Sequence, residues 1–349
     1  RALEFRQYDS DGNLTLHATP SALAGYAISN YTLTPTYQSE GGQYTVGLVH
    51  LHTYYRETTT GSGGGAVAGF QHYDHARQGR DGTPILLRAY AYTERSITLD
   101  LGGSSSSSSS SGADALVVTV YPLAKQTRNR NEDGSGGIET RYAYSWHEGT
   151  VQMQERITTL PAIAPWQNGS GVAATRTERF DIHGNLLWLK DERGFITGHE
   201  YAAGPALVSR TIQDVDDARL SVPSGWSTPA GGGRHLVTDT WYDAQGRPTQ
   251  VLGPEHEVEG VNVRTARWTV YQDTDHQTWS AQGYAVESAS SSSSSGRGDL
   301  PPYDYTLVNP VSISKRDATG TRGESIQATR ASTSGALDEP PHPVSGIAR

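Results

Sequence analysis

One tetrapeptide, Asp-x-x-Gly, recurs along the chain and constrains its fold more than any other feature. In its fullest form it follows an aromatic residue and precedes a run of β-prone residues. Asp at the first position of a type I turn accepts backbone N–H bonds, and Gly at the fourth position supplies the positive φ that closes a bulged hairpin. Each copy therefore predicts a chain reversal. The clean copies are Asp9 with Gly12, Asp181 with Gly184, Asp191 with Gly194, Asp243 with Gly246, and Asp317 with Gly320.

The spacing of these turns leaves little room for helices. Asp181 and Asp191 lie close together, so the residues from Gly184 to Asp191 predict a single strand of about five to six residues between two turns. Ser, Gly, Thr and Pro are frequent throughout the chain, and this composition disfavours long helices. The sequence therefore predicts an all-β fold built as an array of antiparallel hairpins. The phrase at 271–273 is interpreted as a decayed copy of the same turn.

Aromatic residues follow the period of two that is typical of strands. Tyr142, Tyr144 and Trp146 alternate with small or polar residues and are expected on one face of a strand, and Tyr90 and Tyr92 repeat the scheme. The chain has 19 Tyr and 7 Trp against 4 Phe, a balance that suits rings buried while a polar atom keeps a partner. These residues predict an aromatic sheet face.

Insertions rich in Gly, Ser and Pro interrupt the strand signal without ending it. They lie near residues 60–69, 102–112, 223–233 and 288–298, and two of them contain serine runs that are interpreted either as flexible linkers or as placeholders for undetermined residues. Because strand signal resumes after each insertion, the sequence predicts one array over 1–349 with embellished hairpin ends. The chain starts at Arg1 without methionine, and the whole is interpreted as a fragment of a longer protein.

Composition narrows the function classes. A net charge of −9 without a Lys/Arg cluster argues against nucleic-acid binding. The absence of cysteine excludes disulfides and thiolate metal sites. The longest apolar stretch, Ala115–Ala124, contains a proline and is far shorter than the roughly 20 residues that a membrane helix needs. No membrane span is expected.

The repeated phrases resemble the YD repeats of the Rhs family. The best match runs over 180–201 and contains two turns, and the segments 242–249 and 8–15 are nearly as close. The resemblance implies a ribbon of antiparallel hairpins that coils into a shell-like sheet, as in Rhs toxins, the cocoon of insecticidal toxin complexes and teneurins. In those proteins the shell encloses a toxic C-terminal domain or serves adhesion at the cell surface. The family's Asp-Pro motif near an autoproteolytic site is absent from this sequence.

Several residue groups could hold a metal ion, each with a simpler alternative. His50 and His52, together with the segment 72–75, could form a zinc site or be surface and hydrogen-bonded histidines. The segment 129–139 could be a calcium loop or a plain polar turn. Asp214, Asp216 and Asp217 could gather a cation or form a solvated acidic turn. In each case the simpler reading is preferred, so no metal, cofactor or catalytic residue is expected.

The function expected is that of a structural β-scaffold in an exported or cell-surface protein. The Asp residues recur at one place in every copy, as turn residues do, and no Gly-x-Ser-x-Gly elbow is present to expose a nucleophile. The expected partners are flanking repeats of the same polypeptide or identical subunits, with an enclosed toxin domain or a surface glycan as further possibilities. The alternative is a carbohydrate-binding or adhesive module, suggested by aromatic side chains on alternating strands. The tripeptide 297–299 matches an integrin-binding sequence, but beside a serine run it is interpreted as loop composition.

Overall fold

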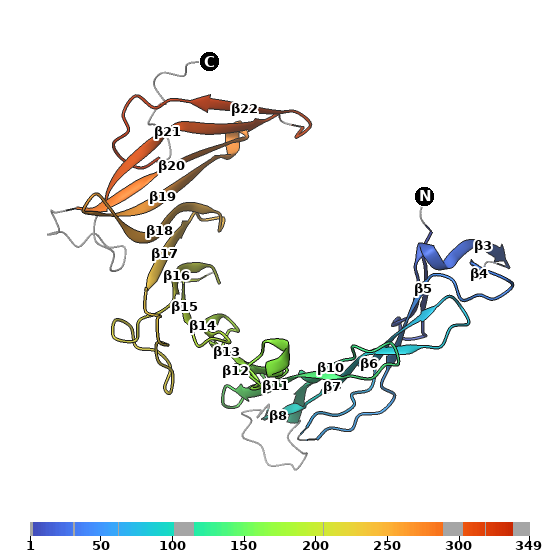
Figure 1. Cartoon of the computed structure of the whole chain (residues 1–349). Helices are drawn as coiled ribbons and strands as arrows, with labels where there is room; N and C mark the ends of the chain where they lie inside the picture. The colour runs from blue at the N-terminus through green and yellow to red at the C-terminus, as the bar shows by residue number, and fades with distance from the viewer. Residues whose placement is uncertain are drawn as a thin grey trace, which may run out of the picture. The chain divides into compact units, whose positions relative to one another are not determined.

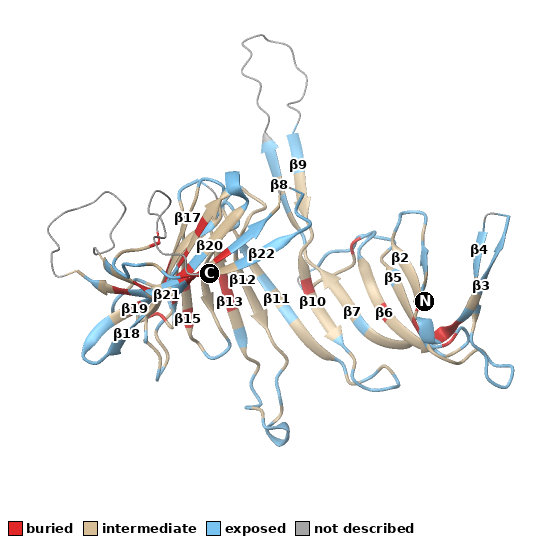
Figure 2. Cartoon of the chain, turned by 90° about the horizontal axis from the view of Figure 1, so that it is seen from above, coloured by how far each residue is buried: buried red, intermediate tan, exposed pale blue. Residues whose placement is uncertain are grey.

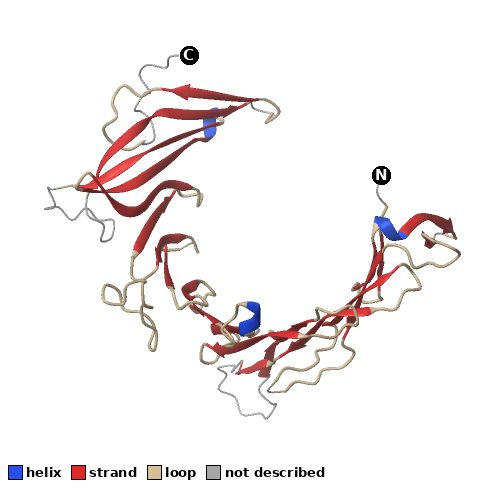
Figure 3. Cartoon of the chain, viewed as in Figure 1, coloured by secondary structure: helices blue, strands red, loops and turns tan. Residues whose placement is uncertain are grey.

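Every long element in the described part of the chain is a β-strand (Figure 3). The computed structural model describes residues 3–30, 32–61, 63–100, 115–204, 206–288, 303–317 and 319–337. Within these ranges the only helices are short 3-10 turns, at Pro20–Ala22 (η1), Pro165–Gln167 (η2) and Asp273–Asp275 (η3). The all-β class and the antiparallel pairing expected from the sequence are confirmed. No helix in the described part of the chain is long and apolar enough to cross a membrane.

The chain folds as two compact units, Arg1–Gly184 (unit 1) and Asn185–Arg349 (unit 2). In unit 1 an antiparallel ladder runs in the order β1, β2, β5, β6, β7, β10, β11, β12, β13. The hairpins β3–β4 and β8–β9 form separate two-stranded sheets inserted between ladder strands (Figure 1). The strands are β1 Phe5–Tyr8, β2 Leu14–Ala18, β3 Leu23–Ser29, β4 Thr32–Tyr37, β5 Leu48–Tyr54, β6 Gln71–Gln78, β7 Ile85–Tyr92, β8 Arg95–Asp100, β9 Ala115–Val120, β10 Leu123–Arg128, β11 Ile138–Trp146, β12 Met153–Thr159 and β13 Thr175–Phe180.

Unit 2 is a meander in which each strand pairs with the next along the chain. Its longest strands are β18 to β21, which precede the short final strand β22 (Figure 1). The strands are β14 Leu186–Lys190, β15 Ile196–Tyr201, β16 Val208–Gln213, β17 Leu236–Tyr242, β18 Pro248–Val258, β19 Val261–Gln272, β20 Gln277–Glu287, β21 Tyr303–Arg316 and β22 Gly323–Ala328.

Burial alternates along the strands because successive side chains point to opposite faces of a sheet. Along β19, Arg264, Ala266, Trp268 and Val270 are buried, while most of the residues between them are exposed. Along β11 the half-buried residues alternate with exposed ones over 141–146, and the half-buried set contains the three aromatic side chains. In Figure 2 the fully buried residues appear only as short patches on a few strands of each unit. The sheets therefore hold small apolar cores.

The cores lie where loops or long strands cover the sheet. In unit 1 a cluster of Ala18, Ala22, Leu23 and Val49 lies under the start of the β3–β4 hairpin. In unit 2 the largest cluster surrounds Trp268, and a smaller one joins two strands to the segment between β16 and β17. The smaller cluster contains Ile196, Ile212 and Val215 with Trp188, Leu220, Val222, Trp226 and Val237 packed against them.

The predicted insertions lie between strands where the structure describes them. The segment 60–69 returns to the sheet of unit 1, because the adjacent Thr59 bridges Ala66 and Gly65 bridges Tyr92. The segment 223–233 was expected to be a loop tip, but its Trp226 packs against the smaller core of unit 2. The segments 102–112 and 289–298 lie outside the described residues, as does the tripeptide 297–299. A single array over 1–349 stays a prediction.

Truncation of Trp268 tests the main core of unit 2. Its side chain is 2% exposed, its ring meets the Tyr305 ring edge-on at 5.8 Å, and its indole N–H donates to Gln250 Oε1 at 3.2 Å. We expect Trp268→Ala to lower the free energy of unfolding of unit 2 by about 3–5 kcal/mol in urea titrations. The control, Trp166→Ala in unit 1, removes a ring that is 85% exposed and is expected to lower the free energy of unfolding of unit 1 by no more than about 0.5 kcal/mol. Similar costs for the two variants would contradict this core.

Candidate functional site

The Asp-x-x-Gly turns share one hydrogen-bonded geometry. At 191–195, Asp191 Oδ1 accepts the backbone N–H groups of Arg193 at 2.9 Å and Phe195 at 2.8 Å. The Asp191 carbonyl accepts the N–H of Gly194, the Asp191 N–H donates to the Phe195 carbonyl, and Gly194 has a φ of +90°. One carboxylate oxygen thus holds two amides that would otherwise point into the turn without a partner.

The other turns repeat this pattern with local variation. Asp9 Oδ1 accepts N–H bonds from residues 11 and 13, and Asp243 Oδ1 accepts them from residues 245 and 247. Asp181 Oδ1 accepts the N–H of His183, and Asp317 Oδ1 that of Thr321. The N–H of Gly12, Gly184, Gly246 and Gly320 donates in each case to the carbonyl of the turn's Asp, and φ at these glycines lies between +70° and +88°.

The bonds accepted by these carboxylates shift their pKa values. The backbone N–H of Asn13 holds the pKa of Asp9 below its ordinary value. Desolvation raises the pKa of Asp243, but the backbone and guanidinium N–H groups of Arg247 outweigh it, so the pKa again lies below the usual range. Arg247 also donates two bonds to Asp273, at 2.6 and 2.9 Å, and lowers that pKa as well.

The decayed copy near 271–273 also forms a turn, in which His276 takes the position of the glycine. Asp273–Asp275 form η3, the N–H of His276 donates to the Asp273 carbonyl at 3.3 Å, and His276 has a φ of +53°. The Asp-x-x-His spacing thus reproduces Asp-x-x-Gly. The sequence reading placed the Asp of this copy correctly but missed the residue that adopts the left-handed conformation, because histidine carries no such signal.

Glycine exchanges test the backbone conformation of these turns. Gly246→Ala puts a side chain at a φ of +79°, which is expected to cost about 1–2 kcal/mol. His276→Gly removes the same strain and is expected to raise the free energy of unfolding by up to about 1 kcal/mol. Both are measured by urea titration. Gly25→Ala is the control, because Gly25 has no positive φ and open space around its Cα; a loss there equal to that of Gly246→Ala would contradict the account.

Tyrosine hydroxyls tie the strands together at a recurring place. Tyr201, the last residue of β15, donates through its hydroxyl to the carbonyl of Leu186, the first residue of β14, at 2.9 Å. The pairing of β15 with the following strand shifts register directly before Tyr201. The tyrosine therefore bonds to the preceding strand at the point where the ladder to the following strand is irregular.

The same bond occurs elsewhere in both units. In each case a tyrosine among the last three residues of a strand donates to the carbonyl of the first residue of a paired strand. Tyr54, Tyr242 and Tyr271 each donate to the carbonyl of the first residue of a strand. A register shift again directly precedes Tyr54 and Tyr242. Three acceptors stand two positions after a turn glycine in the sequence. The bonds are Tyr54 to Leu14, Tyr92 to Gln71, Tyr144 to Leu123, Tyr201 to Leu186, Tyr242 to Val208 and Tyr271 to Pro248, at 2.7–3.3 Å.

The predicted aromatic face is partly explained by these bonds. Tyr92 and Tyr144 donate to strand starts, and burial raises the pKa of each to about 12. Trp146 stacks on Tyr144 with the ring centroids 5.8 Å apart, Tyr90 donates to Asp74 Oδ2 at 2.7 Å, and Tyr142 is half-buried beside them.

Removing a single hydroxyl tests the tyrosine bond. Tyr242→Phe leaves the ring and deletes the donor to the Val208 carbonyl, 2.8 Å away. Because an intramolecular hydrogen bond contributes about 0.5–1.5 kcal/mol, we expect the free energy of unfolding of unit 2 to fall by that amount. Tyr284→Phe in the same unit is the control, since its side chain is 39% exposed. An equal or larger loss in the control would contradict the assigned role.

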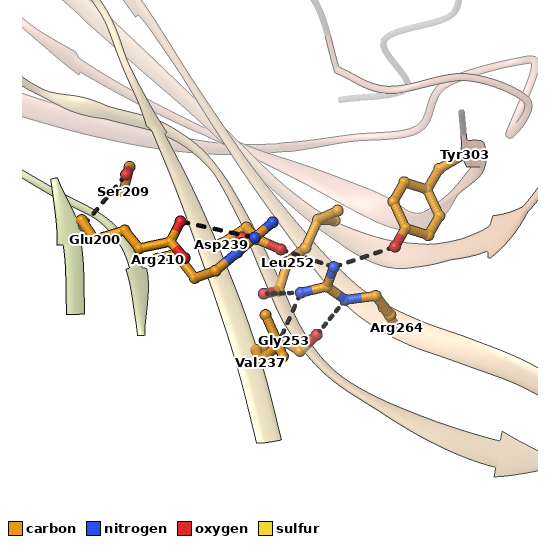
Figure 4. A network of polar contacts seen from close by, with 9 residues as sticks. All are labelled: Glu200, Ser209, Arg210, Val237, Asp239, Leu252, Gly253, Arg264 and Tyr303. Carbon is orange, nitrogen blue, oxygen red and sulfur yellow. Dashed lines mark hydrogen bonds and ion pairs between the residues drawn. The ribbon is translucent and has the colours of Figure 1, made fainter. Parts of the chain in front are cut away.

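A buried charge network crosses β16 to β19 in unit 2 (Figure 4). Asp239 lies between two guanidinium groups, with its Oδ1 2.6 Å from Arg210 Nε and its Oδ2 2.8 Å from Arg264 Nη1. The side chains of Asp239 and Arg264 are only 4% and 6% exposed. Arg264 also donates to the Tyr303 hydroxyl at 3.2 Å.

Arg264 fills an interruption in the β18–β19 ladder. The register shifts between Leu252 and Glu255, which frees the carbonyls of Leu252 and Gly253 to accept from Arg264 at 3.1 and 2.7 Å. The Val237 carbonyl accepts a further bond at 3.0 Å. With the Tyr303 hydroxyl this gives four hydrogen-bond acceptors, and Asp239 Oδ2 adds an ion-pair contact at 2.8 Å. The buried charge is therefore paired with a carboxylate, and most of the N–H donors of the guanidinium are used.

The proposed zinc residues are only partly brought together. His52 Nδ1 lies 2.6 Å from Asp74 Oδ1 across β5 and β6, and Asp74 also accepts from Gln71 and Tyr90. His50 pairs in register with His17 on β2, and the two rings stack with centroids 6.0 Å apart. His72 stacks between Tyr55 and Tyr73, and His75 meets the Tyr73 ring at its edge. Within the described ranges no three His, Asp or Glu side chains are arranged to hold a metal ion.

The segment 129–139 and the acidic residues 214–217 also do not form a metal site; their carboxylates bond to nearby loop and strand residues. In the segment 129–139, Asp133 accepts the N–H of Ser135, and Glu139 is held by Arg141 and Lys125. Asp214 accepts the N–H groups of Gly233 and Arg234. Asp216 accepts the N–H of Ala218, and Asp217 the hydroxyl of Thr228. These carboxylates fix turns rather than converge on one point.

Lowering the pH tests the contribution of the turn carboxylates. The pKa values of Asp9, Asp243, Asp273 and Asp317 lie below the ordinary value in the folded chain. Their stabilising contribution is therefore complete above the ordinary aspartate pKa of about 4 and is lost as the pH falls through the folded values. We expect the melting temperature to fall below about pH 4, and to fall less steeply in Asp243→Asn combined with Asp273→Asn. An unchanged slope in that variant would contradict the assignment.

Comparison with known proteins assigns no family. No protein-family model matches the sequence, and no curated protein matches it. Among solved structures, the Tc holotoxin pore of Photorhabdus luminescens aligns with 93% of this chain at 11% identity, and this chain spans 17% of the length of that one. The TM-score of 0.18 is too low for the alignment to establish a common fold.

Proposed function

We propose that this chain is a wall segment of a large exported or cell-surface protein built from YD-type β-hairpins, and that its function is mechanical. It encloses cargo or assembles with neighbouring repeats or subunits. The observation that carries the proposal is the repetition of two devices, the carboxylate-bonded turn and the tyrosine-to-carbonyl bond, in both units. Repetition is what a scaffold requires, whereas a single active site needs one convergent set of residues.

A wall of this kind gains rigidity from polar contacts between adjacent strands. Glu155 on β12 pairs in register with Arg179 on β13, and their side chains are 2.6 Å apart. The next pair, Arg156 and Glu178, repeats the contact at 2.7 Å with the charges exchanged. Because neighbouring residues point to opposite faces, the two ion pairs brace both sides of the same ladder.

The end strands supply the means of assembly. β1 pairs with β2 along one side, and β22 pairs with β21. A further hairpin added along the other side of either strand would continue the ladder by backbone hydrogen bonds, the mode known as β-augmentation. Such pairing accounts for partners that are flanking repeats of the same polypeptide or identical subunits.

A carbohydrate-binding or adhesive surface is the second candidate, favoured by one exposed group of apolar side chains. Between β12 and β13, Ile163, Trp166 and Val172 are 56%, 85% and 71% exposed. An indole presented in this way is suited to stacking on a sugar ring. A glycan array tests this candidate. Binding lost in Trp166→Ala supports a sugar-binding surface, and no retained glycan removes that candidate.

Electron microscopy of the intact assembly that carries this chain tests the scaffold proposal. A shell is expected to place the hairpin ladder around an enclosed density, and an assembly of subunits is expected to join ladders edge to edge. A compact particle in which the chain forms neither a wall nor a continued sheet would overturn the proposal.

A further inference from the structure

A cavity in unit 2 is lined by several positively charged side chains. It measures about 440 Å³ and is lined by side chains from β15 to β19, from the segment between β16 and β17, and from β21. Four arginines and His235 face two glutamates around it. The cavity lies beside the network drawn in Figure 4, which contributes Arg210, Arg264 and Tyr303 to the lining.

The buried part of this cavity carries more positive than negative charge. Arg210 and Arg264 share the single carboxylate of Asp239. Two further acids line the cavity, and both are exposed, so water screens their charges. Glu200 lies 3.7 Å from Arg210 with its side chain 55% exposed, and Glu255 pairs in register with Arg264. An excess guanidinium charge in a partly buried site favours the entry of an anion.

Two further arginines that line the cavity, Arg219 and Arg234, make no ion pair through their guanidinium groups among the described residues. Among the described residues, no carboxylate or carbonyl is bonded to the side chain of Arg219 or Arg234, although both line the cavity. Both are exposed, so they form its rim. Guanidinium groups bind carboxylates and phosphates through two parallel N–H bonds, which makes such a rim selective for oxyanions.

His235 adds a neutral donor between these arginines. Its Nδ1 accepts the backbone N–H of Asp216 at 3.2 Å, so the proton of the neutral ring resides on Nε2. Burial lowers the pKa of His235, and the charges of Arg219 and Arg210 lower it further against the opposing effect of Asp216. The imidazole therefore offers an N–H donor without adding charge.

Part of the cavity wall is apolar. Ile212, Leu220, Leu236 and Val237 line it, and Ile212 is buried. Cavities of about 300–1,000 Å³ with apolar walls and a few polar groups are typical of small-molecule sites. An inorganic ion would use the rim and leave this wall uncovered.

We propose that this cavity binds a small organic oxyanion, a carboxylate or phosphate ester, with its charged group at Arg219, Arg234 and His235 and its organic part against Leu220 and Val237. The site goes beyond the mechanical role of the wall and does not depend on it. It would allow the wall to hold a small acidic compound or to respond to one.

Calorimetric titration at pH 7 and low ionic strength tests the proposal. The probes are succinate and phenyl phosphate, with inorganic phosphate for comparison. We expect saturable binding of one molecule per chain, with at least one organic probe bound more tightly than inorganic phosphate. Arg219→Gln combined with Arg234→Gln is expected to weaken it at least tenfold. Both residues are exposed, and an unchanged melting temperature without ligand verifies that the variant is folded.

A matched control separates the site from overall charge. Arg193→Gln combined with Arg322→Gln removes the same two charges from exposed turns of unit 2 that do not line the cavity, and its affinity is expected to remain within about twofold of the unmodified chain. Equal weakening in the two double variants would overturn the proposal, as would the absence of saturable binding by both organic probes. Inorganic phosphate bound at least as tightly as both organic probes would overturn the role given to the apolar wall.

Discussion

The bond from an aspartate oxygen to backbone amides in the Asp-x-x-Gly turns is the contact on which the hairpins closed by these turns depend. A thin sheet has few fully buried side chains, so the order of its strands is determined largely by where the chain reverses. At Asp9, Asp191 and Asp243 a single carboxylate oxygen fixes both the second and the fourth amide of the turn. The glycine that follows accepts the left-handed conformation without steric cost. Each strand that follows such a turn consequently starts in a defined register.

The tyrosine hydroxyls extend this control across the ladder. Leu14, Leu186 and Pro248 each stand two positions after a turn glycine, and each accepts a bond from a tyrosine of a paired strand. The residues just after a turn are thus held by a ring that also covers apolar surface. Where the ladder is interrupted more deeply, at the register shift in β18, Arg264 supplies the missing donors instead. Hydrogen bonds from polar side chains to backbone carbonyls thus stabilise strand positions that a larger apolar core would otherwise stabilise.

The sequence revealed the turns but not the bonds between strands. Asp and Gly at fixed spacing have one dominant explanation in local geometry, so the reversals and the all-β class could be predicted from residues that are adjacent in the chain. His276 was missed because its left-handed conformation is imposed by the hairpin and not encoded by a glycine. The partners of Tyr54 and Arg264 lie up to 40 residues away, and their contacts exist only once the ladder has formed. For the histidines of 50–75 the sequence left a metal site as an alternative to hydrogen-bonded histidines. In the fold one of them bonds to Asp74, and others stack on aromatic or histidine rings.

Residue-resolved hydrogen exchange under native conditions tests the central claim most directly. The backbone amides of Asn13, Phe195 and Arg247, each at the fourth position after a turn aspartate, are bonded to a carboxylate oxygen at 2.8–2.9 Å. The account predicts that these amides exchange as slowly as the strand amides beside them, and that each loses its protection when its own aspartate is replaced by alanine. Exchange of these amides at the rate of an unstructured chain in the unmodified protein would contradict it.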